Sequence, residues 1–176
     1  MADKLLLPVP QSAPELPKRR GIKTDSGWIN YDITHYWAYH SRTGEILGYT
    51  VRYETPEGKQ VLPLTLWQCS DRLKWKFRGF PEPRPVFNQH LITHRHEAKI
   101  ILTEGEKCCE LLQNLIDHTN SRKFVSACWI GGAQGVYKID WSVMQGRSVI
   151  LWPDNDTPGR DCMLNIAGIL RRMDCN

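Results

Sequence analysis

The sequence lacks the features that mark several classes of protein. No apolar run reaches the roughly 18 residues that a membrane span needs, so no membrane partner is expected. The amino terminus has one three-leucine run before prolines and charges, which is not the pattern of a signal peptide. The six cysteines form no CxxC pair, and none has a histidine at zinc-finger spacing. These absences predict a cytoplasmic protein with reduced thiols and no zinc-binding module.

The composition is that of a folded protein with a mild positive charge. Of the 176 residues, 41% are hydrophobic and 24% are charged, which supports one domain or two small lobes and excludes a mainly disordered chain. Lysine and arginine together number 23, against 19 aspartate and glutamate residues, so the net charge is +4. That excess allows a nucleic-acid partner without requiring one.

Residues 1–26 are predicted to form a flexible basic arm. This segment holds five lysine or arginine side chains and four prolines, without hydrophobic periodicity. Its short basic run, Lys18-Arg19-Arg20, suits either contact with phosphates or a solvated tail.

Residues 27–96 are predicted to form an antiparallel, strand-rich lobe. Between residues 45 and 54, apolar and polar side chains alternate, and turn signals stand at Arg42-Thr43-Gly44 and at Thr55-Pro56-Glu57-Gly58. The return strand, 59–67, contains Pro63, which indicates an edge position or a bulge.

The strand that follows, 73–78, carries positive charge on one face only. Lys74, Lys76 and Arg78 alternate there with apolar residues. Such a ribbon can follow a phosphate backbone, or it can be an outer face that keeps a sheet edge from pairing.

Residues 97–176 are predicted to form an α/β fold. Short apolar strands at 99–103, 123–128 and 148–152 are interspersed with helices at 106–118 and 158–173. This order is typical of a parallel sheet covered by helices. The first helix has Leu111, Leu112 and Leu115 on one side, and the last has Thr157 as its expected N-cap.

Acidic residues stand where two of these strands end. Glu104 follows the first strand, and Asp154 and Asp156 follow the third. Ligands of parallel sheets gather beyond the carboxyl ends of the strands. Carboxylates brought together there repel by about 4 kcal/mol per pair at 4 Å, which a bound cation relieves. Oxygen-only ligands suit Mg²⁺ or Mn²⁺.

Each acid also has a simpler explanation when taken alone. Asp154-Asn155-Asp156 suits a turn with a helix cap, and Glu104 suits the positive end of a helix dipole. Lys107 lies in a first helical turn, where a cation opposes the dipole. It is either kept for phosphate contact or is an exposed helix lysine.

These residues together resemble a known family. TEGEK at 103–107, the glycines at 131–132 and VILWPDNDTPGR at 149–160 are similar to the Toprim domain of DnaG-type primases, topoisomerases, recombination proteins and some nucleases. The resemblance implies a Rossmann-like parallel sheet over 97–176. It also implies that Glu104, Asp154 and Asp156 are the catalytic and metal-binding acids. Gly105 and Gly159 match glycines of the family pattern, and Gly131 and Gly132 resemble its central glycine motif. The resemblance leads us to expect nucleotide or metal contacts at Gly105, Gly131, Gly132 and Lys107.

The upstream lobe resembles the segment that precedes Toprim in DnaG-type primases, especially those of phages and plasmids. The similarity rests on Gly48-Tyr49-Thr50-Val51-Arg52, Lys59 and Arg84-Pro85-Val86-Phe87. It implies a metal-dependent DNA primase-type nucleotidyltransferase that uses a single-stranded DNA template and nucleoside triphosphates, with a replicative helicase as a further partner. The expected phosphate-binding residues are Arg52, Lys59, Lys74, Lys76 and Arg84. Asp154 and Asp156 would hold the metal, and Glu104 would share it or move a proton.

The sequence also departs from the family pattern. It has no helicase motor loop, and it stops near Met173, short of the strand and helix with which Toprim domains continue, so the domain is expected to be truncated. Two other functions therefore stay open. One is a metal-dependent Toprim nuclease, and the other is a non-catalytic module that binds single-stranded nucleic acid. Four tryptophans of the first lobe are either core residues or platforms for unpaired bases: Trp28, Trp37, Trp67 and Trp75.

Overall fold

The computed structural model describes residues 3–25 and 27–176 and divides the chain into two compact units. Unit 1 comprises Met1–Tyr39 and Glu45–Phe80, and unit 2 comprises His40–Gly44 and Pro81–Asn176. These limits differ from the predicted boundaries at 27 and 97. The turn at 40–44 belongs to unit 2 because the Gln89 side chain donates to the His40 carbonyl at 2.6 Å and Arg42 pairs with Asp140 at 2.9 Å.

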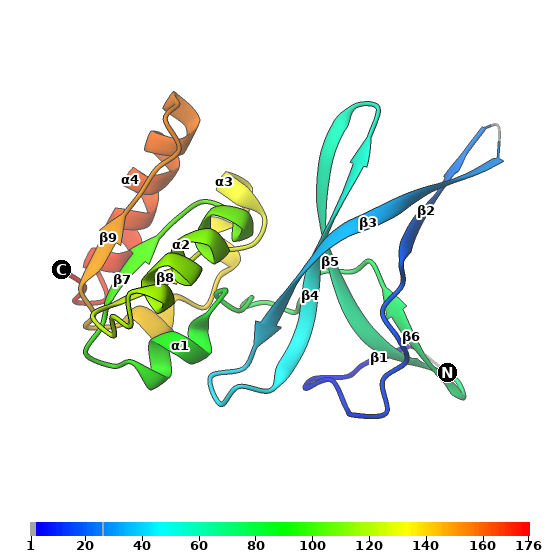
Figure 1. Cartoon of the computed structure of the whole chain (residues 1–176), viewed down its shortest axis with the longest axis horizontal. Helices are drawn as coiled ribbons and strands as arrows, with labels where there is room; N and C mark the ends of the chain where they lie inside the picture. Colours follow the sequence, from blue (N-terminus) through cyan, green and yellow to red (C-terminus); the bar gives the residue numbers. More distant parts are fainter. Residues whose placement is uncertain (1–2, 26) are drawn as a thin grey trace. The chain divides into compact units, whose positions relative to one another are not determined.

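Unit 1 is an antiparallel sheet with the strand order β1-β5-β4-β3-β2, and β6 also pairs with β5 (Figure 1). The strands are β1 (Lys4–Leu5), β2 (Arg19–Thr24), β3 (Gly27–His40), β4 (Ile46–Thr55), β5 (Gly58–Cys69) and β6 (Arg72–Lys76). Strand β5 pairs with β4 along its first half and with β1 and β6 along its second half. Pro63 lies opposite Thr50 in the first half, before the pairing with β6 begins, so its missing N–H interrupts no bond to β6.

The predicted flexible arm is wrong over residues 19–24, which form β2. The six residues of β2 pair in register with β3, from Arg19 opposite Asp32 to Thr24 opposite Gly27. The segment before β2 is also held, because the Pro14 carbonyl accepts from Trp75 Nε1 at 2.8 Å. Basic side chains suit an outer sheet strand as well as a tail, and pairing with the long strand β3 decides between them.

The core of unit 1 forms around Gly48, the first residue of the motif that resembles primases. Gly48 has φ 154°, and a Cβ there would lie 2.9 Å from both the Leu64 carbonyl and a ring carbon of Phe80. The Phe80 ring packs on Tyr39, with the ring centroids 5.1 Å apart. A glycine at this position therefore lets β4 approach β5 and the aromatic core closely.

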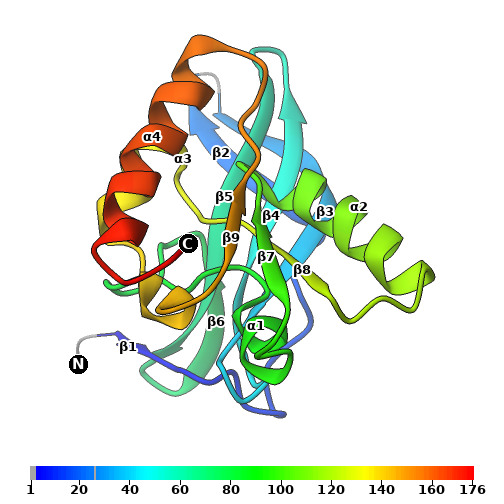
Figure 2. The ribbon, with the colours of Figure 1, turned by 90° about the vertical axis from the view of Figure 1, so that its left-hand side faces the viewer.

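Unit 2 contains the predicted parallel sheet. Its strands are β7 (Lys99–Leu102), β8 (Phe124–Ala127) and β9 (Val149–Leu151), in the order β8-β7-β9 with β7 in the middle. The helices are α1 (Gln89–His94), α2 (Glu106–His118), α3 (Gly132–Gly135), η1 (Val136–Lys138), η2 (Trp141–Met144) and α4 (Thr157–Arg171). Figure 2 shows α2 and α4 on opposite faces of this sheet. Among the described residues, no helix has the length and hydrophobicity needed to cross a bilayer.

Helix α2 has the predicted limits, and the side that carries Leu111 and Leu115 faces solvent. Leu111 and Leu115 do share a side, yet they are 59% and 63% exposed. The buried side instead carries Cys109 and Gln113. Gln113 Oε1 accepts from the backbone N–H of Ser126 at 2.9 Å, so a polar contact with β8 sets the rotation of the helix.

A histidine pair joins the 40–44 turn to α1. The rings of His40 and His90 are 4.4 Å apart. Burial, together with the nearby His40 and His94, lowers the pKa of His90 from its usual 6.5 to about 4. The unfolded chain therefore binds a proton at His90 at a higher pH than the folded chain does. This site favours the folded state above pH 6.5, and the contribution is lost as the pH falls from 6.5 toward 4.

We expect His90→Gln to weaken the loss of stability at acid pH. Urea midpoints measured at pH 7.5 and pH 5.0 should differ less for the variant than for the parent. His118→Gln, at an exposed position at the end of α2, controls for the histidine-to-glutamine change itself. An equal pH dependence in the parent and His90→Gln would contradict this assignment.

Candidate active site

Glu104 and Asp156 meet around Gly159 at the carboxyl end of the parallel sheet. Glu104 Oε1 accepts a hydrogen bond from the backbone N–H of Asp154 at 2.9 Å. Asp156 Oδ1 accepts from the backbone N–H of Gly159 at 2.7 Å. A Cβ on Gly159 would overlap Glu104 Oε1 and would lie 3.0 Å from Asp156 Oδ1. The structure thus brings two of the three predicted acids to one point and ties the third to them through its backbone.

The neighbouring strands β7 and β9 produce this arrangement. Leu102 and Leu151, the last residues of the two strands, lie opposite each other, and the Trp152 N–H donates to the Leu102 carbonyl at 2.9 Å. Both chains therefore leave the sheet side by side. Glu104 lies between β7 and α2, and Asp154 and Asp156 lie between β9 and α4, as the sequence predicted.

Asp156, and not Thr157, is the N-cap of α4. The prediction of the cap is wrong by one residue because Asp156 keeps the extended backbone, with φ −138°, and its side chain reaches Gly159. Asp156 therefore does cap a helix, as the simpler explanation from the sequence proposed. One oxygen of Asp156 caps the helix, which leaves the other for a ligand.

A buried thiol lies behind the acids. Burial and the neighbouring Glu104 carboxylate raise the pKa of Cys162. Cys162 lies on the buried side of α4, and its thiol is kept neutral beside the acid. The position of the Glu104 carboxylate beside Gly159 shows that Glu104 turns toward α4.

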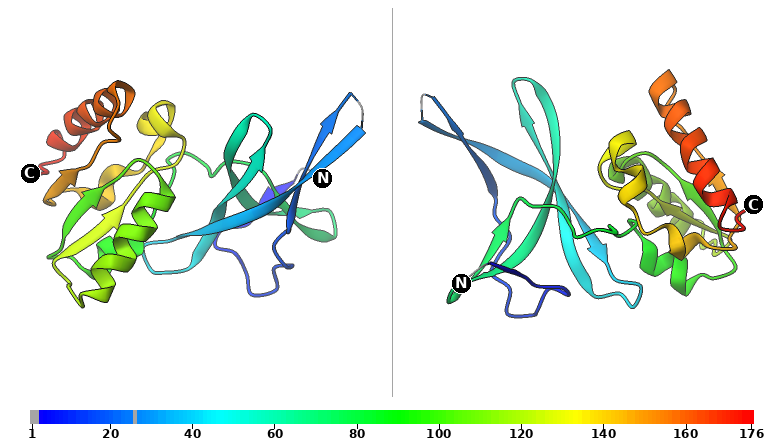
Figure 3. Two further views of the ribbon diagram at one scale, coloured as in Figure 1. Left: turned by 45° about the horizontal axis from the view of Figure 1, so that its top comes forward. Right: turned by 180° about the vertical axis from the view of Figure 1, so that it is seen from behind.

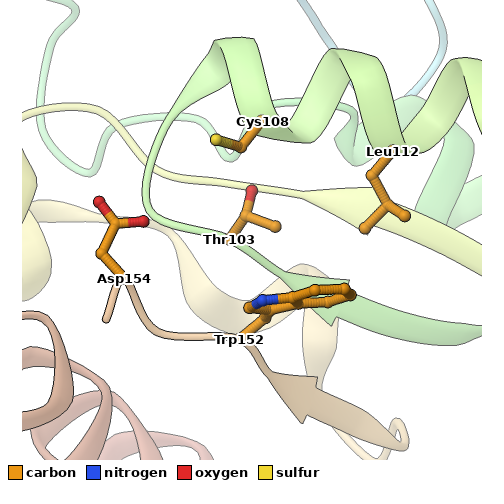
Figure 4. Close-up of a pocket in the computed structure, with 5 residues that line it drawn as sticks. All are labelled: Thr103, Cys108, Leu112, Trp152 and Asp154. Atoms are coloured by element: carbon orange, nitrogen blue, oxygen red, sulfur yellow. The ribbon is translucent and has the colours of Figure 1, made fainter. Parts of the chain in front are cut away.

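Asp154 lines a small pocket on the other side of the loop. Figure 4 shows Cys108 and Leu112 of α2, Thr103 after β7, and Trp152 and Asp154 after β9 around it. Its volume is about 180 Å³, below the roughly 300 Å³ at which ordinary small-molecule pockets begin. Trp152 is 58% exposed and forms part of its wall. The acids therefore lie at an open edge and not inside an enclosed cavity.

The donor set at this edge fits a hard divalent cation. Among residues 3–25 and 27–176, no three histidine, cysteine or acidic side chains are already grouped as a metal site. Mg²⁺, however, is usually held by one or two carboxylates together with substrate phosphates and water. Asp154 and Asp156 are exposed and have carboxylate oxygens that no described hydrogen bond uses. A site of this kind is completed by its substrate.

The other predicted ligands of unit 2 are distributed around the same end of the sheet. Gly105 is the extended N-cap of α2, and neither a positive φ nor a close contact requires a glycine there. Lys107 is exposed in the first turn of α2.

The glycine loop after β8 contacts Arg84. Gly131 and Gly132 have φ 94° and 54°, which glycine adopts without strain. A Cβ on Gly131 would lie 3.2 Å from Arg84 Nη1. Arg84 also pairs with Glu82 at 3.4 Å. The loop therefore lets a partly buried guanidinium lie against its backbone.

Strand β5 brings the four predicted basic residues of unit 1 to one face of the sheet. Lys59 is on β5 itself, and the other three lie opposite alternate β5 residues: Arg52 opposite Val61, Lys76 opposite Thr65 and Lys74 opposite Trp67. We call this side, defined by Arg52, Lys59, Lys74 and Lys76, the basic face.

Acidic neighbours neutralise part of the basic face. Arg52 pairs with Glu54 through Nε at 3.0 Å, and Lys76 pairs with Asp3. The hydrogen bond to Asp3 raises the pKa of Lys76. Lys59 and Lys74 are exposed. The latter two are therefore the members best placed to meet phosphates.

Solved structures from bacteriophage T7 have a similar fold. The first is the primase fragment of the T7 primase–helicase protein, with 18% sequence identity and a TM-score of 0.51, covering 90% of this chain and 55% of that chain. The chain has a primase-like fold. The second shows T7 lagging-strand DNA polymerase with primase domains bound to an RNA/DNA hybrid and dTTP, at 19% identity and a TM-score of 0.50, covering 86% of this chain and 65% of that chain.

The likeness is one of fold. The chain spans less than two thirds of the length of either T7 chain. No family model matches the sequence, and no curated protein matches it.

Proposed function

We propose that this chain is the core of a DNA primase-type nucleotidyltransferase with a Toprim-like unit 2. The observation that carries the proposal is the meeting of Glu104 and Asp156 around Gly159, with Asp154 tied to them. The primase-like fold of the whole chain supports it. The proposed substrates are a single-stranded DNA template and nucleoside triphosphates.

Asp154 and Asp156 would hold one or two Mg²⁺ or Mn²⁺ ions. When bound, such an ion would neutralise the triphosphate and stabilise the charge that develops as a 3′ hydroxyl attacks the α-phosphorus and pyrophosphate leaves. Glu104 orients the loop, because its Oε1 accepts the Asp154 N–H. Its second oxygen is left to share the ion or to move a proton.

The remaining residues of the site bind phosphates. Arg84 lies against Gly131 in the loop that follows β8, and Lys107 is in the first turn of α2, after β7. Parallel sheets bind ligands on this side, beyond the carboxyl ends of their strands. The basic face of unit 1 would contact the template backbone without reading its sequence. The T7 protein with a similar fold is a primase–helicase, so we also propose a replicative helicase as a partner.

One synthesis assay tests this function. The protein is mixed with a single-stranded DNA template, labelled nucleoside triphosphates and Mg²⁺ or Mn²⁺, and the products are resolved on a denaturing gel. We expect short new oligonucleotides that disappear when a chelator removes the cation and return when excess Mg²⁺ is added. A shortened template without new product would instead indicate a nuclease. Template binding without either product would favour a non-catalytic binding module.

A further inference from the structure

We propose that Trp28 is a stacking platform for an unpaired base of single-stranded DNA. This inference rests on the proposed function, because it names where unit 1 would hold the template. Trp28 lies on β3 near the turn of the β2–β3 hairpin, and its side chain is 68% exposed. Figures 1 and 3 show the turn end of this hairpin standing free of the other strands of unit 1.

The Trp28 ring packs over Gly21 of the neighbouring strand β2. Lys23 lies opposite Trp28, and Gly21, two residues along β2, lies opposite Asn30. A Cβ on Gly21 would lie 3.4 Å and 3.6 Å from two carbons of the Trp28 ring, at ordinary contact distance. The ring therefore packs against the backbone where β2 has no side chain. Most of its surface remains available to a base, which needs only an aromatic face.

The ring shares the basic face of the sheet. Tyr31 and Tyr53 contact each other across β3 and β4, with ring centroids 6.0 Å apart, so they lie on one side. Trp28 is three residues from Tyr31 and so points to the opposite side, as Arg52 does relative to Tyr53. Trp28 and its cross-strand neighbour Lys23 therefore extend the basic face. An exposed aromatic ring beside a cation, on the same side of a sheet as further cations, is a pattern that single strands bind.

The other tryptophans of unit 1 have different surroundings. Trp37 is 3% exposed. The Trp67 ring has the Arg78 guanidinium 4.9 Å from its centroid. Trp75 contacts Tyr49 edge-on, and its N–H donates to the Pro14 carbonyl. Of the four predicted candidates, Trp28 is the most exposed.

The test compares Trp28 variants on normal and abasic oligonucleotides. Fluorescence anisotropy would measure the Kd for a labelled single-stranded oligonucleotide, without nucleoside triphosphates. Trp28→Leu keeps an apolar side chain but removes the flat ring, and we expect about tenfold weaker binding. Trp28→Phe should recover most of the affinity. On an abasic oligonucleotide of equal length, the parent and Trp28→Leu should bind equally.

The neighbouring residue supplies the matched control. Ile29 is 41% exposed but points to the other side of the same strand, so Ile29→Ala should leave the Kd unchanged. A second measurement uses the unaltered protein. Photocrosslinking to an oligonucleotide that contains 5-iododeoxyuridine should place the crosslink on Trp28, as mapped by mass spectrometry. Unchanged affinity of Trp28→Leu, an equal loss on the abasic strand, or crosslinks confined to other residues would overturn the proposal.

The outcome is separable from that of the proposed function. Trp28-dependent binding without any primer synthesis would refute the primase activity and leave the platform standing. If substitution of the acids abolished primer synthesis but Trp28→Leu left DNA binding unchanged, only the platform would be refuted.

Discussion

Glu104→Gln and Asp156→Asn are each expected to remove metal-dependent primer synthesis while the fold is retained. Both amides keep an oxygen that can accept the existing hydrogen bond, from the Asp154 N–H in one case and the Gly159 N–H in the other. Asparagine is also a good helix N-cap, so α4 should keep its start. What each variant loses is the negative charge. Because metal stabilisation of a developing charge is worth several kcal/mol, we expect a loss on the order of 100-fold or more.

The measurement is the initial rate of primer synthesis at saturating Mg²⁺, with circular dichroism as the check on folding. The matched control is Asp161→Asn, which removes one exposed charge from the same helix as Asp156 without touching Gly159. It should retain the parent's rate. If both site variants kept that rate as well, the assignment of the acids would be wrong.

Gly159→Ala is expected to reduce synthesis by about 100-fold although it adds one methyl group. Gly159 is buried in the first turn of α4, where its new Cβ would overlap Glu104 Oε1. The Asp154 carbonyl would lie 3.1 Å away, so the backbone on that side leaves little room. The Glu104 carboxylate therefore has to move, and a displacement of about 1 Å can cost 100-fold in rate.

A glycine later in the same helix provides the comparison. A Cβ added at Gly168 would have no atom of a neighbouring element within 4 Å. Gly168→Ala should therefore follow helix propensity, raising the free energy of unfolding by about 0.5–1 kcal/mol without changing the rate. Thermal unfolding and the synthesis assay on the two variants separate the steric effect at the site from the general effect of alanine. A Gly159→Ala variant as active as the parent would show that the Glu104 position is unimportant.

The strands and acids of unit 2 were predictable because their signals are local. A short apolar run such as 99–102, followed by a glycine and a helical pattern, specifies its own secondary structure. Once the strands are parallel, their carboxyl ends meet at one edge, which places Glu104 near Asp154 and Asp156. The alternation around Arg52 and Lys74 likewise predicted their faces.

Long-range pairing could not be predicted in the same way. The segment around Arg19 has the composition of a tail, and it becomes a strand because β3 is long enough to pair with it. The rotation of α2 also depends on a partner: Gln113 finds the Ser126 N–H, so Leu111 and Leu115 face outward against the usual rule. Neither partner is visible in the sequence near these residues.

By itself, the sequence determined the three strands and two long helices of unit 2, the charged face of the 73–78 strand and the position of the three acids at strand ends. Each of these depends on residues within one or two turns or strands. The tertiary structure alone decided which atoms meet. It placed Gly159 between Glu104 and Asp156, Arg84 against Gly131, and Trp28 over Gly21. Those contacts join residues distant along the chain or across a hairpin, and close packing leaves room for them only where glycine has no side chain.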